Sequence, residues 1–346
     1  MDPRVVQLQK HAAEQENVLG FCGGLPANEL LPREELGRAL ADVTSSREDA
    51  LQYGWPEGTE QVRRWVVDRL ARRGATIEPD AVIITAGAQQ ALAIAATVLA
   101  GSSITVGDAT YPGALDAFRR AGAQPVARGG DVAYVMAGVA NPLGRAMPVE
   151  AARIAIADEA YTELRFDGHI ARPLIADAPD TTWHVGTISK TLAPGLRIGW
   201  LIPPRAHHDE ALDIKAATDL QTASITQAAL GHLLQSLDYD AFVTRARTEY
   251  ARRAERLVAA LRTHVPALRF DEPEGGFSIW AHTDREGDEV ALLQAAFDAG
   301  VMIDPGSLFR VDQVAPVSMR LSFSSTRIDQ IDEGARRLAR ALDTWR

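Results

Sequence analysis

Between residues 81 and 202 the sequence alternates short, almost wholly apolar runs with longer amphipathic segments. Runs such as "AVIIT", "SITV", "VAYVMA" and "RIAIAD" have the length of single strands, and "QQALAIAATVLA" and "GALDAFRRAG" lie between them with the pattern of helices. Strands that are apolar throughout are buried on both faces, as in parallel sheets covered by helices. The pattern therefore predicts an α/β fold with a mostly parallel sheet sandwiched by helices, and ligands in such sheets bind beyond the carboxyl ends of the strands.

The rest of the chain divides differently. Residues 59–74 predict a helix with Thr59 as N-cap and Gly74 as its stop, and residues 205–265 are helical in pattern. The last 80 or so residues mix strands with two helices. We therefore expect a large α/β domain over 42–245 and a small α+β domain built from both chain ends, 1–41 and 246–346.

Composition excludes several classes of protein. Thirty-six basic residues against 46 acidic ones give a net charge of −10, which disfavours nucleic-acid binding. Cys22 is the only cysteine, so no intrachain disulfide can form, as expected in a reducing compartment. The polar N-terminus lacks a signal-peptide core, and no run approaches the roughly 20 apolar residues of a membrane span. We expect a cytoplasmic protein that binds neither nucleic acid nor membrane.

Three polar features fall where predicted strands end. Asp158 closes "RIAIAD" with Tyr161 three residues on, Asn141 precedes Pro142 after "VAYVMA", and Gly87 lies in a strand-to-helix turn that would present N–H groups to an anion. Each alone has an ordinary explanation: a helix cap or ion pair, an Asn-Pro turn, or a tight connection.

A fourth feature changes their combined meaning. The stretch "TISKTLAPGLRIGW" places Lys190 and Arg197 seven residues apart with almost nothing else polar between them. Pyridoxal phosphate needs this set of groups: an amine for its aldehyde, a carboxylate for its ring nitrogen, and N–H groups, hydroxyls and a guanidinium for its phosphate. No GxGxxG follows a strand and no GxxxxGK[ST] occurs, so the two common nucleotide motifs are missing.

The order of motifs resembles the fold-type I aminotransferases of class I/II, closest to the branch with 2-aminoadipate and kynurenine aminotransferases. The matching pieces run from about residue 19 to 325 and include "FCGGLPANELLP", "LQYGWPEGTEQVR", "TAGAQQAL", "YPGALDAFRRAG", "NPLG", "DEAYTELRFDG", "SKTLAPGLRIGW", "PEGGFSIW" and "MRLSFS". The resemblance implies a pyridoxal-phosphate-dependent aminotransferase that moves the amino group of an α-amino acid to a 2-oxo acid by a ping-pong mechanism, without a metal.

The resemblance also implies roles for single residues. Lys190 would form the internal aldimine and then act as general base. Asp158 would pair with the pyridine nitrogen, and Asn141 and Tyr161 with the phenolic oxygen. The implied phosphate contacts are Arg197, Thr187 and Ser189 with the backbone of Gly87, Ala88 and Gln89.

Further roles concern the ring, the substrate and a second subunit. Tyr111 would stack on the ring, Arg320 would clasp the substrate α-carboxylate, and Gly24 would lie beside the substrate, close to Cys22. Tyr53 would reach a phosphate in the neighbouring subunit, which implies a homodimer with shared active sites. Alternatives stay open: Tyr111 as a plain strand-end aromatic, Ser189 as loop support, Arg320 facing solvent, and Trp55 as pocket wall or dimer contact.

The chain departs from the family pattern in places. Ala88 stands where many relatives have a hydroxyl residue. The segments from Tyr111 to Asn141 and from Asn141 to Asp158 are short, and residues 142–152 give only 11 residues for a crossover that normally takes a dozen or more. We expect at most about a turn of helix there and a thinly covered sheet face. The short N-terminal arm puts side-chain selection by that arm in doubt.

Two other functions remain as alternatives. A pyridoxal-phosphate lyase, decarboxylase or cyclising enzyme would use the same cofactor. Aminotransferase-like domains of this branch also occur behind winged-helix DNA-binding domains, but only about 20 residues precede "GGLP" and the net charge is acidic. The identity of the amino donor stays open.

Overall fold

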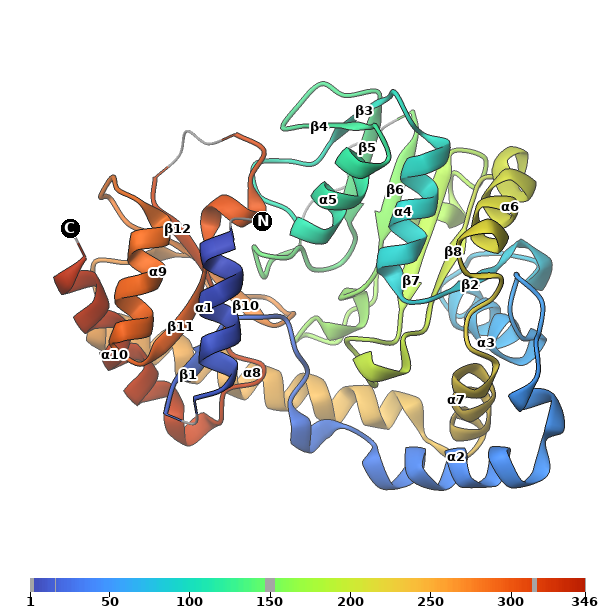
Figure 1. Cartoon of the computed structure of the whole chain (residues 1–346), viewed down its shortest axis with the longest axis horizontal. Coiled ribbons are helices and arrows are strands. Elements are labelled where there is room, and N and C mark those ends of the chain that lie inside the picture. The colour runs from blue at the N-terminus through green and yellow to red at the C-terminus, as the bar shows by residue number, and fades with distance from the viewer. Residues whose placement is uncertain (1–2, 16, 147–152, 313–315, 346) are drawn as a thin grey trace.

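The computed structural model describes residues 3–15, 17–146, 153–312 and 316–345. These residues form two bodies, each built around one sheet, with helices on the outside (Figure 1). None of the helices in the described ranges combines the length and the apolar character needed to cross a membrane.

The larger body contains a seven-stranded sheet of order β2-β8-β7-β6-β5-β3-β4. Strands β7, β6, β5, β3 and β4 run parallel, and β8 is antiparallel to both β7 and β2. The strands are β2 (Ile83–Thr85), β3 (Ser103–Thr105), β4 (Gln124–Val126), β5 (Val132–Met136), β6 (Ala155–Asp158), β7 (Thr182–Thr187) and β8 (Gly199–Ile202). The predicted mostly parallel sheet is present, and β6 and β7 are buried along their whole length, as their apolar sequences require.

Helices pack on this sheet and on one another. α4 packs on β7 and β8, and α4 and α5 lie side by side on the face turned to the viewer in Figure 1. α2 packs on α7, and α7 also contacts α3. Their bounds are α2 (Arg33–Ser46), α3 (Glu60–Ala71), α4 (Ala88–Val98), α5 (Pro112–Arg120), α6 (His208–Asp219) and α7 (Ser224–Ser236).

The smaller body contains a five-stranded sheet of order β1-β11-β12-β10-β9. Its strands are β1 (Leu19–Phe21), β9 (Arg269–Phe270), β10 (Ser278–His282), β11 (Val301–Pro305) and β12 (Ser318–Ser322), and its helices are α1 (Pro3–Ala13), α9 (Glu289–Asp298) and α10 (Ile331–Thr344). β1 pairs with β11, so both chain ends contribute to this body.

Helix α8 (Tyr239–His264) runs along both bodies. It packs against α10 of the smaller body and against the short helix Thr162–Leu164 of the larger one. The predicted domain boundaries at 41/42 and 245/246 fall inside α2 and α8, so the division at those residues stays a prediction.

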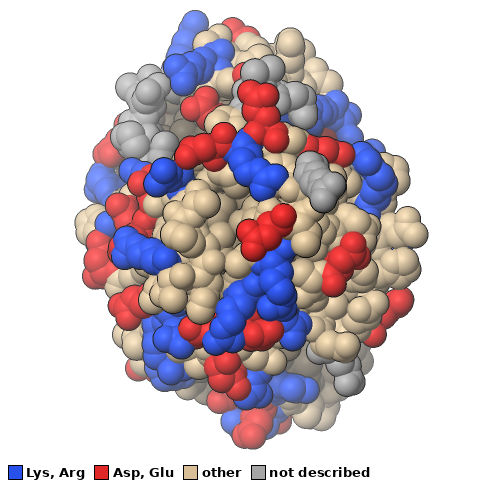
Figure 2. Space-filling view, turned by 90° about the vertical axis from the view of Figure 1, so that its left-hand side faces the viewer, with Lys and Arg blue, Asp and Glu red and all other residues tan. Residues whose placement is uncertain are grey.

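Several arginines of α8 are paired with acids. Arg252 pairs with Glu249, Arg256 with Asp332, and Arg262 with Glu272. On the face that the smaller body presents in Figure 2, basic and acidic side chains are interspersed. The part of α8 that carries these arginines is therefore an ion-paired helix surface.

The predicted start of α3 at Thr59 is confirmed, but the contact that holds it is not a local cap. Thr59 occupies the N-cap position of α3, but its side chain makes no capping hydrogen bond and its buried hydroxyl has no partner among the described residues. The backbone N–H of Thr59 instead donates to Gln227 Oε1 of α7 at 2.8 Å. A contact between two helices, and not a local cap, holds the start of α3.

The short connection after β5 can be followed only in part. Residues 141–146 form turns without helix. Residues 147–152 lie outside the described residues, so the predicted lack of a full helix between Asn141 and Asp158 is not decided there.

Candidate active site

Most predicted site residues lie on or just beyond the carboxyl edge of the seven-stranded sheet. Asp158 ends β6, Thr187 ends β7, and the chain after β5 leads to Asn141. Because β5, β6 and β7 are parallel neighbours in register, these residues meet at one edge. Lys190 lies in the loop that follows β7.

The Lys190 amine is held by a backbone carbonyl. Its Nζ donates to Gly24 O at 2.7 Å and lies 5.7 Å from the ring centre of Tyr161. Burial and, after it, the nearby Arg320 guanidinium lower the pKa of Lys190 to about 8, against the attraction of Asp158. A substantial fraction of this amine is neutral near neutral pH, as a nucleophile or general base requires.

Asp158 is buried and has only neutral hydrogen-bond donors in the described structure. Tyr134 OH donates to Oδ2 at 2.7 Å, and the backbone N–H of Ala160 donates to Oδ1 at 3.0 Å. Burial raises the pKa of Asp158, while these two hydrogen bonds and Lys190 oppose the rise. A buried carboxylate in this condition can accept a cationic partner.

Tyr134, the donor to Asp158, was not identified as a site residue from the sequence. It lies in β5, is buried, and packs edge-on against Phe118. A single hydroxyl in an otherwise apolar strand was the available signal, because a buried tyrosine normally finds a hydrogen-bond partner.

The turn before α4 forms an anion cradle. Gly87 is the N-cap of α4 and has φ +83°, and the first N–H groups of the helix, at Ala88 and Gln89, have no intrahelical acceptor. A Cβ on Gly87 would lie 2.7 Å from Arg197 Nη2, so the guanidinium lies directly against this turn. Arg197 Nη2 also donates to Ala86 O at 3.0 Å.

Thr187 and Ser189 lie together in the same loop. The two hydroxyl oxygens are 2.9 Å apart, and Thr187 Oγ1 also donates to Ile198 O at 2.8 Å and accepts from Ser189 N–H at 3.1 Å. Thr187 thus supports the loop, and Ser189 is buried beside it.

Tyr111 is the N-cap of α5 and is tied to the cradle. Its hydroxyl donates to Gln89 Oε1 at 3.2 Å, and Gln89 Nε2 donates to Gly113 O at 2.7 Å. Burial raises the pKa of Tyr111 to about 12, so the phenol stays protonated.

Arg320 joins the cluster from the smaller body. It lies in β12 and is buried, and its Nη1 donates to Asn141 Oδ1 at 2.9 Å. Its Nε and Nη2 donate to Asp304 Oδ2 at 3.0 and 2.7 Å, a partner that sequence analysis missed.

Gly24 marks the point where these groups converge. A Cβ built there would lie 3.2 Å from Tyr161 OH, 3.7 Å from Arg320 Nη1 and 3.7 Å from Lys190 Nζ. Tyr161 is buried, and burial raises the pKa of its hydroxyl. The phenol, the guanidinium and the amine therefore surround one small space.

Tyr53 is not brought to this cluster within the single chain. Its side chain is 78% exposed, and the neighbouring Trp55 is 76% exposed. Cys22, predicted beside the site, is partly buried and lies close enough to Arg320 and Asp304 for both charges to act on its thiol.

The residues present fit pyridoxal phosphate. A buried amine with a lowered pKa, a buried carboxylate whose hydrogen-bond donors among the described residues are all neutral, and a helix N-terminus with an adjacent guanidinium match its aldehyde, ring nitrogen and phosphate.

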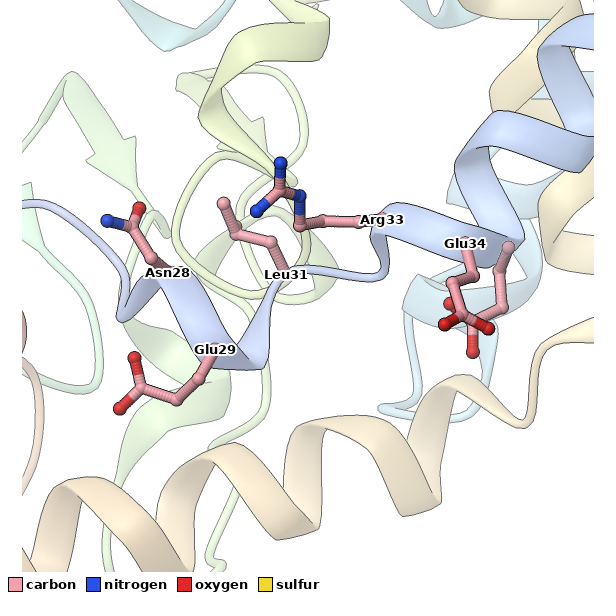
Figure 3. A pocket seen from close by; sticks show the side chains of 6 residues that line it. Asn28, Glu29, Leu31, Arg33 and Glu34 are labelled. Atoms are coloured by element: carbon pink, nitrogen blue, oxygen red, sulfur yellow. The ribbon is translucent and has the colours of Figure 1, made fainter.

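A separate surface hollow carries none of these groups. It is lined by Asn28, Glu29, Leu31, Arg33, Glu34 and Glu35 (Figure 3). Glu29 there pairs with Arg253 of α8, and Arg33 and Glu34 point to opposite sides of the chain. The mixed charges and the absence of predicted site residues separate this hollow from the candidate active site.

Solved structures with the same fold define the class of protein. LysN, an α-aminoadipate aminotransferase of Thermus thermophilus solved with N-(5'-phosphopyridoxyl)-L-leucine, is 27% identical with a TM-score of 0.87, covering 97% of this chain and 94% of that one. A kynurenine aminotransferase of Pyrococcus horikoshii, solved with PMP, is 27% identical with a TM-score of 0.90, covering 99% and 95%. The fold is type I of the pyridoxal-phosphate-dependent transferases, as predicted.

Residues 133–338 match the model of the family "Aminotransferase class I and II", which is more than half of the chain, so this chain belongs to that family of enzymes. A 2-aminoadipate transaminase of Thermus thermophilus is 28% identical, covering 95% of this chain and 91% of its own length. An uncharacterized HTH-type transcriptional regulator of Escherichia coli is 29% identical, covering 86% and 71%. The family and enzyme class predicted from sequence are confirmed.

Proposed function

We propose that this chain is a pyridoxal-phosphate-dependent aminotransferase that takes the amino group from an α-amino acid and passes it to a 2-oxo acid in two half-reactions. The convergence of the Lys190 amine, the Tyr161 phenol and the Arg320 guanidinium around Gly24 carries the proposal. When bound, the cofactor supplies an electron-withdrawing ring that stabilises the negative charge left at Cα.

Lys190 both anchors the cofactor and moves the proton. Its Nζ would hold the cofactor by the aldehyde, with loss of water, and as a free amine it would take the proton from Cα of the substrate. The lowered pKa of about 8 supports this role, because an ordinary lysine is protonated at neutral pH. Gly24 O holds the amine on the side where Tyr161 and Arg320 lie.

The remaining residues bind and orient. Asp158 is proposed to keep the ring nitrogen protonated, and Asn141 and Tyr161 to bind the phenolic oxygen. The phosphate is proposed to rest on the N–H groups of Ala88 and Gln89, at the turn formed by Gly87, with Arg197, Thr187 and Ser189, while Tyr111 covers the ring. Arg320 is proposed to hold the substrate carboxylate.

The test separates transamination from other chemistry on the same cofactor. The protein loaded with pyridoxal phosphate is mixed with single amino acids, and the expected result is conversion of its absorbance to that of the pyridoxamine form, reversed by 2-oxoglutarate or pyruvate. Mass analysis of the products would reveal a lyase or decarboxylase by its fragments. Borohydride treatment before substrate should leave the added mass on the Lys190 peptide and not on that of Lys215, the buried lysine paired with Asp219. A chain that no amino donor converts contradicts the proposal.

A homodimer with shared sites is part of the proposal. The exposed apolar side chains Leu51, Tyr53, Trp55 and Leu220 support it. Two of their segments are joined, because Gly54 N–H donates to Gln221 Oε1 and Ser224 Oγ donates to Gln52 O. Tyr53 is proposed to reach the phosphate of the second subunit from this surface.

Regulator relatives give a second candidate role, in which the site senses an amino compound. They are described as HTH-type transcriptional regulators and match most of this chain. A DNA-binding assay on the full chain, with and without cofactor, tests that role independently of the spectral assay.

A further inference from the structure

Arg320, the residue proposed to bind the substrate carboxylate, already has a buried anionic partner. β11 and β12 are antiparallel, and their register places Asp304 directly opposite Arg320. Both side chains are buried, with 9% of Arg320 and 4% of Asp304 exposed. This is an ion pair inside the site and not at its surface.

The pair leaves Arg320 with a defined set of donors. A guanidinium has five N–H groups. Nε and one hydrogen of Nη2 go to Asp304 Oδ2, and one hydrogen of Nη1 goes to Asn141 Oδ1. Within the part of the chain that the structure describes, one N–H on each terminal nitrogen remains without an acceptor, so a carboxylate can bind only to those two.

Asp304 also holds the loop beside the amine. The backbone N–H of Gly23 donates to Oδ2 at 2.9 Å, and Gln9 Nε2 of α1 donates to Oδ1 at 3.4 Å. The next residue, Gly24, carries the carbonyl that accepts from Lys190. One carboxylate thus contacts the proposed substrate arginine, the glycine loop and the first helix.

We propose that Asp304 sets the affinity of the site for substrate, because it offsets the charge of Arg320 and so weakens the binding of carboxylates. The inference rests on the proposed function, in which Arg320 binds the substrate carboxylate. The physical reason is competition: an incoming carboxylate meets a guanidinium whose charge is already balanced by a neighbour at hydrogen-bond distance. Without Asp304 the incoming carboxylate would itself balance the buried charge and bind more tightly.

The single cysteine provides a reporter that needs neither cofactor nor turnover. Burial raises the pKa of the Cys22 thiol to about 12, the Asp304 carboxylate contributes to the rise, and Arg320 opposes it. Because the thiolate is the reactive form, removing the charge of Asp304 should speed alkylation of Cys22.

The experiment compares Asp304→Asn with a matched control, Glu289→Gln. Glu289 pairs with Arg310 in the same body, with 8% and 9% of their side chains exposed, and among the described residues it forms no hydrogen bond or ion pair with a proposed site residue. In the cofactor-loaded protein, Asp304→Asn should bind the unreactive carboxylate butyrate about tenfold more tightly by calorimetry, and lower KM for amino donors more than it changes kcat. In the cofactor-free protein, iodoacetamide should modify Cys22 several-fold faster. Glu289→Gln should leave both measurements at the wild-type values.

Each outcome decides. Unchanged butyrate affinity in Asp304→Asn overturns the inference, whatever the alkylation rate of Cys22, and leaves the proposed function intact. Weaker butyrate binding shows that Asp304 only holds Arg320 in place, and this also overturns it. If no amino donor converts the cofactor of the wild-type protein, the proposed function is contradicted instead. Alkylation of the cofactor-free chain then still measures the effect of the Asp304 charge on Cys22. If Asp304→Asn fails to fold, Asp304→Ser, which keeps an acceptor for Gly23 N–H, takes its place in both measurements.

Discussion

Asp158 and Asp304 are both buried carboxylates, but their partners differ. Asp304 contacts a guanidinium, whereas among the described residues Asp158 accepts only from a phenol and a backbone N–H. Burying an ionised carboxylate with neutral donors alone is costly, and for Asp158 this cost raises the pKa. A protonated ring nitrogen would supply the missing positive charge, so cofactor binding and ionisation of Asp158 should strengthen each other.

Tyr134 is expected to act through Asp158. Tyr134→Phe removes the donor to Oδ2, and a hydrogen bond to a charged group is worth about 1.5–3 kcal/mol. We expect the affinity for pyridoxal phosphate to fall by roughly tenfold to a hundredfold, measured by equilibrium titration of the cofactor-free protein. Tyr250→Phe is the control, since that buried hydroxyl accepts from Ala27 N–H instead. Equal losses in both variants would mean that Tyr134 contributes only to packing.

The amine predicts a pH dependence for cofactor uptake. The pKa of Lys190 is lowered from 10.5 to about 8, so uptake, which needs the neutral amine, should increase as pH rises and level off above about 8. At pH 7 roughly one molecule in ten is competent, against fewer than one in a thousand for an ordinary lysine. Stopped-flow absorbance of cofactor-free protein mixed with pyridoxal phosphate measures the profile. A midpoint near 10 would show that burial does not lower this pKa.

At the scale of elements, the anion cradle depends on a close approach between β8 and α4. A Cβ at Gly199, the first residue of β8, would lie 2.6 Å from Gly87 C and 2.7 Å from Ala88 N, which are backbone atoms that cannot rotate away. Gly199→Ala should therefore push the start of α4 outward, at a cost of about 1–3 kcal/mol in the free energy of unfolding, and weaken phosphate binding.

Gly195 offers the matched control for this change. It lies in the short helix Pro194–Leu196, just before β8, and a Cβ there would meet nothing within 4 Å. Thermal unfolding and cofactor titration of Gly195→Ala should match the wild type. If Gly199→Ala behaves in the same way, the spacing of β8 and α4 is not what shapes the cradle.

The same scale explains what sequence could predict. Apolar strands followed by Asp158, Asn141 and Lys190 identify the sheet edge, because parallel strands end together. Asp304 could not be found in this way: its role depends on the register that places it opposite Arg320, sixteen residues along the chain. The start of α3 was predicted at Thr59, but the contact that holds it was not, because Gln227, which accepts from the N–H of Thr59, lies 168 residues away.

For the whole molecule, the exposed apolar side chains of Leu51, Tyr53, Trp55 and Leu220 are the feature that supports a partner chain. Leu220 is 61% exposed and has φ +61°, a backbone conformation unfavourable for leucine, and hydrogen bonds from Gly54 and Ser224 tie its loop and α7 to the segment of Tyr53 and Trp55. Apolar side chains gathered in this way on a surface mark an interaction site.

Trp55→Asp combined with Leu220→Asp should convert the proposed dimer into monomers, because each change places a carboxylate in an apolar contact. Light scattering after size exclusion measures the mass, and Thr248→Asp on the exposed face of α8 is the control for added charge. If Tyr53 reaches the phosphate of the second subunit, the monomer should also lose affinity for pyridoxal phosphate.

Tyr53→Phe should remain a dimer yet bind the cofactor about tenfold more weakly, the effect of one lost hydrogen bond to a charged group. A wild-type monomer that transaminates at full rate would show that each chain completes its own site, and Tyr53 would then have no part in it.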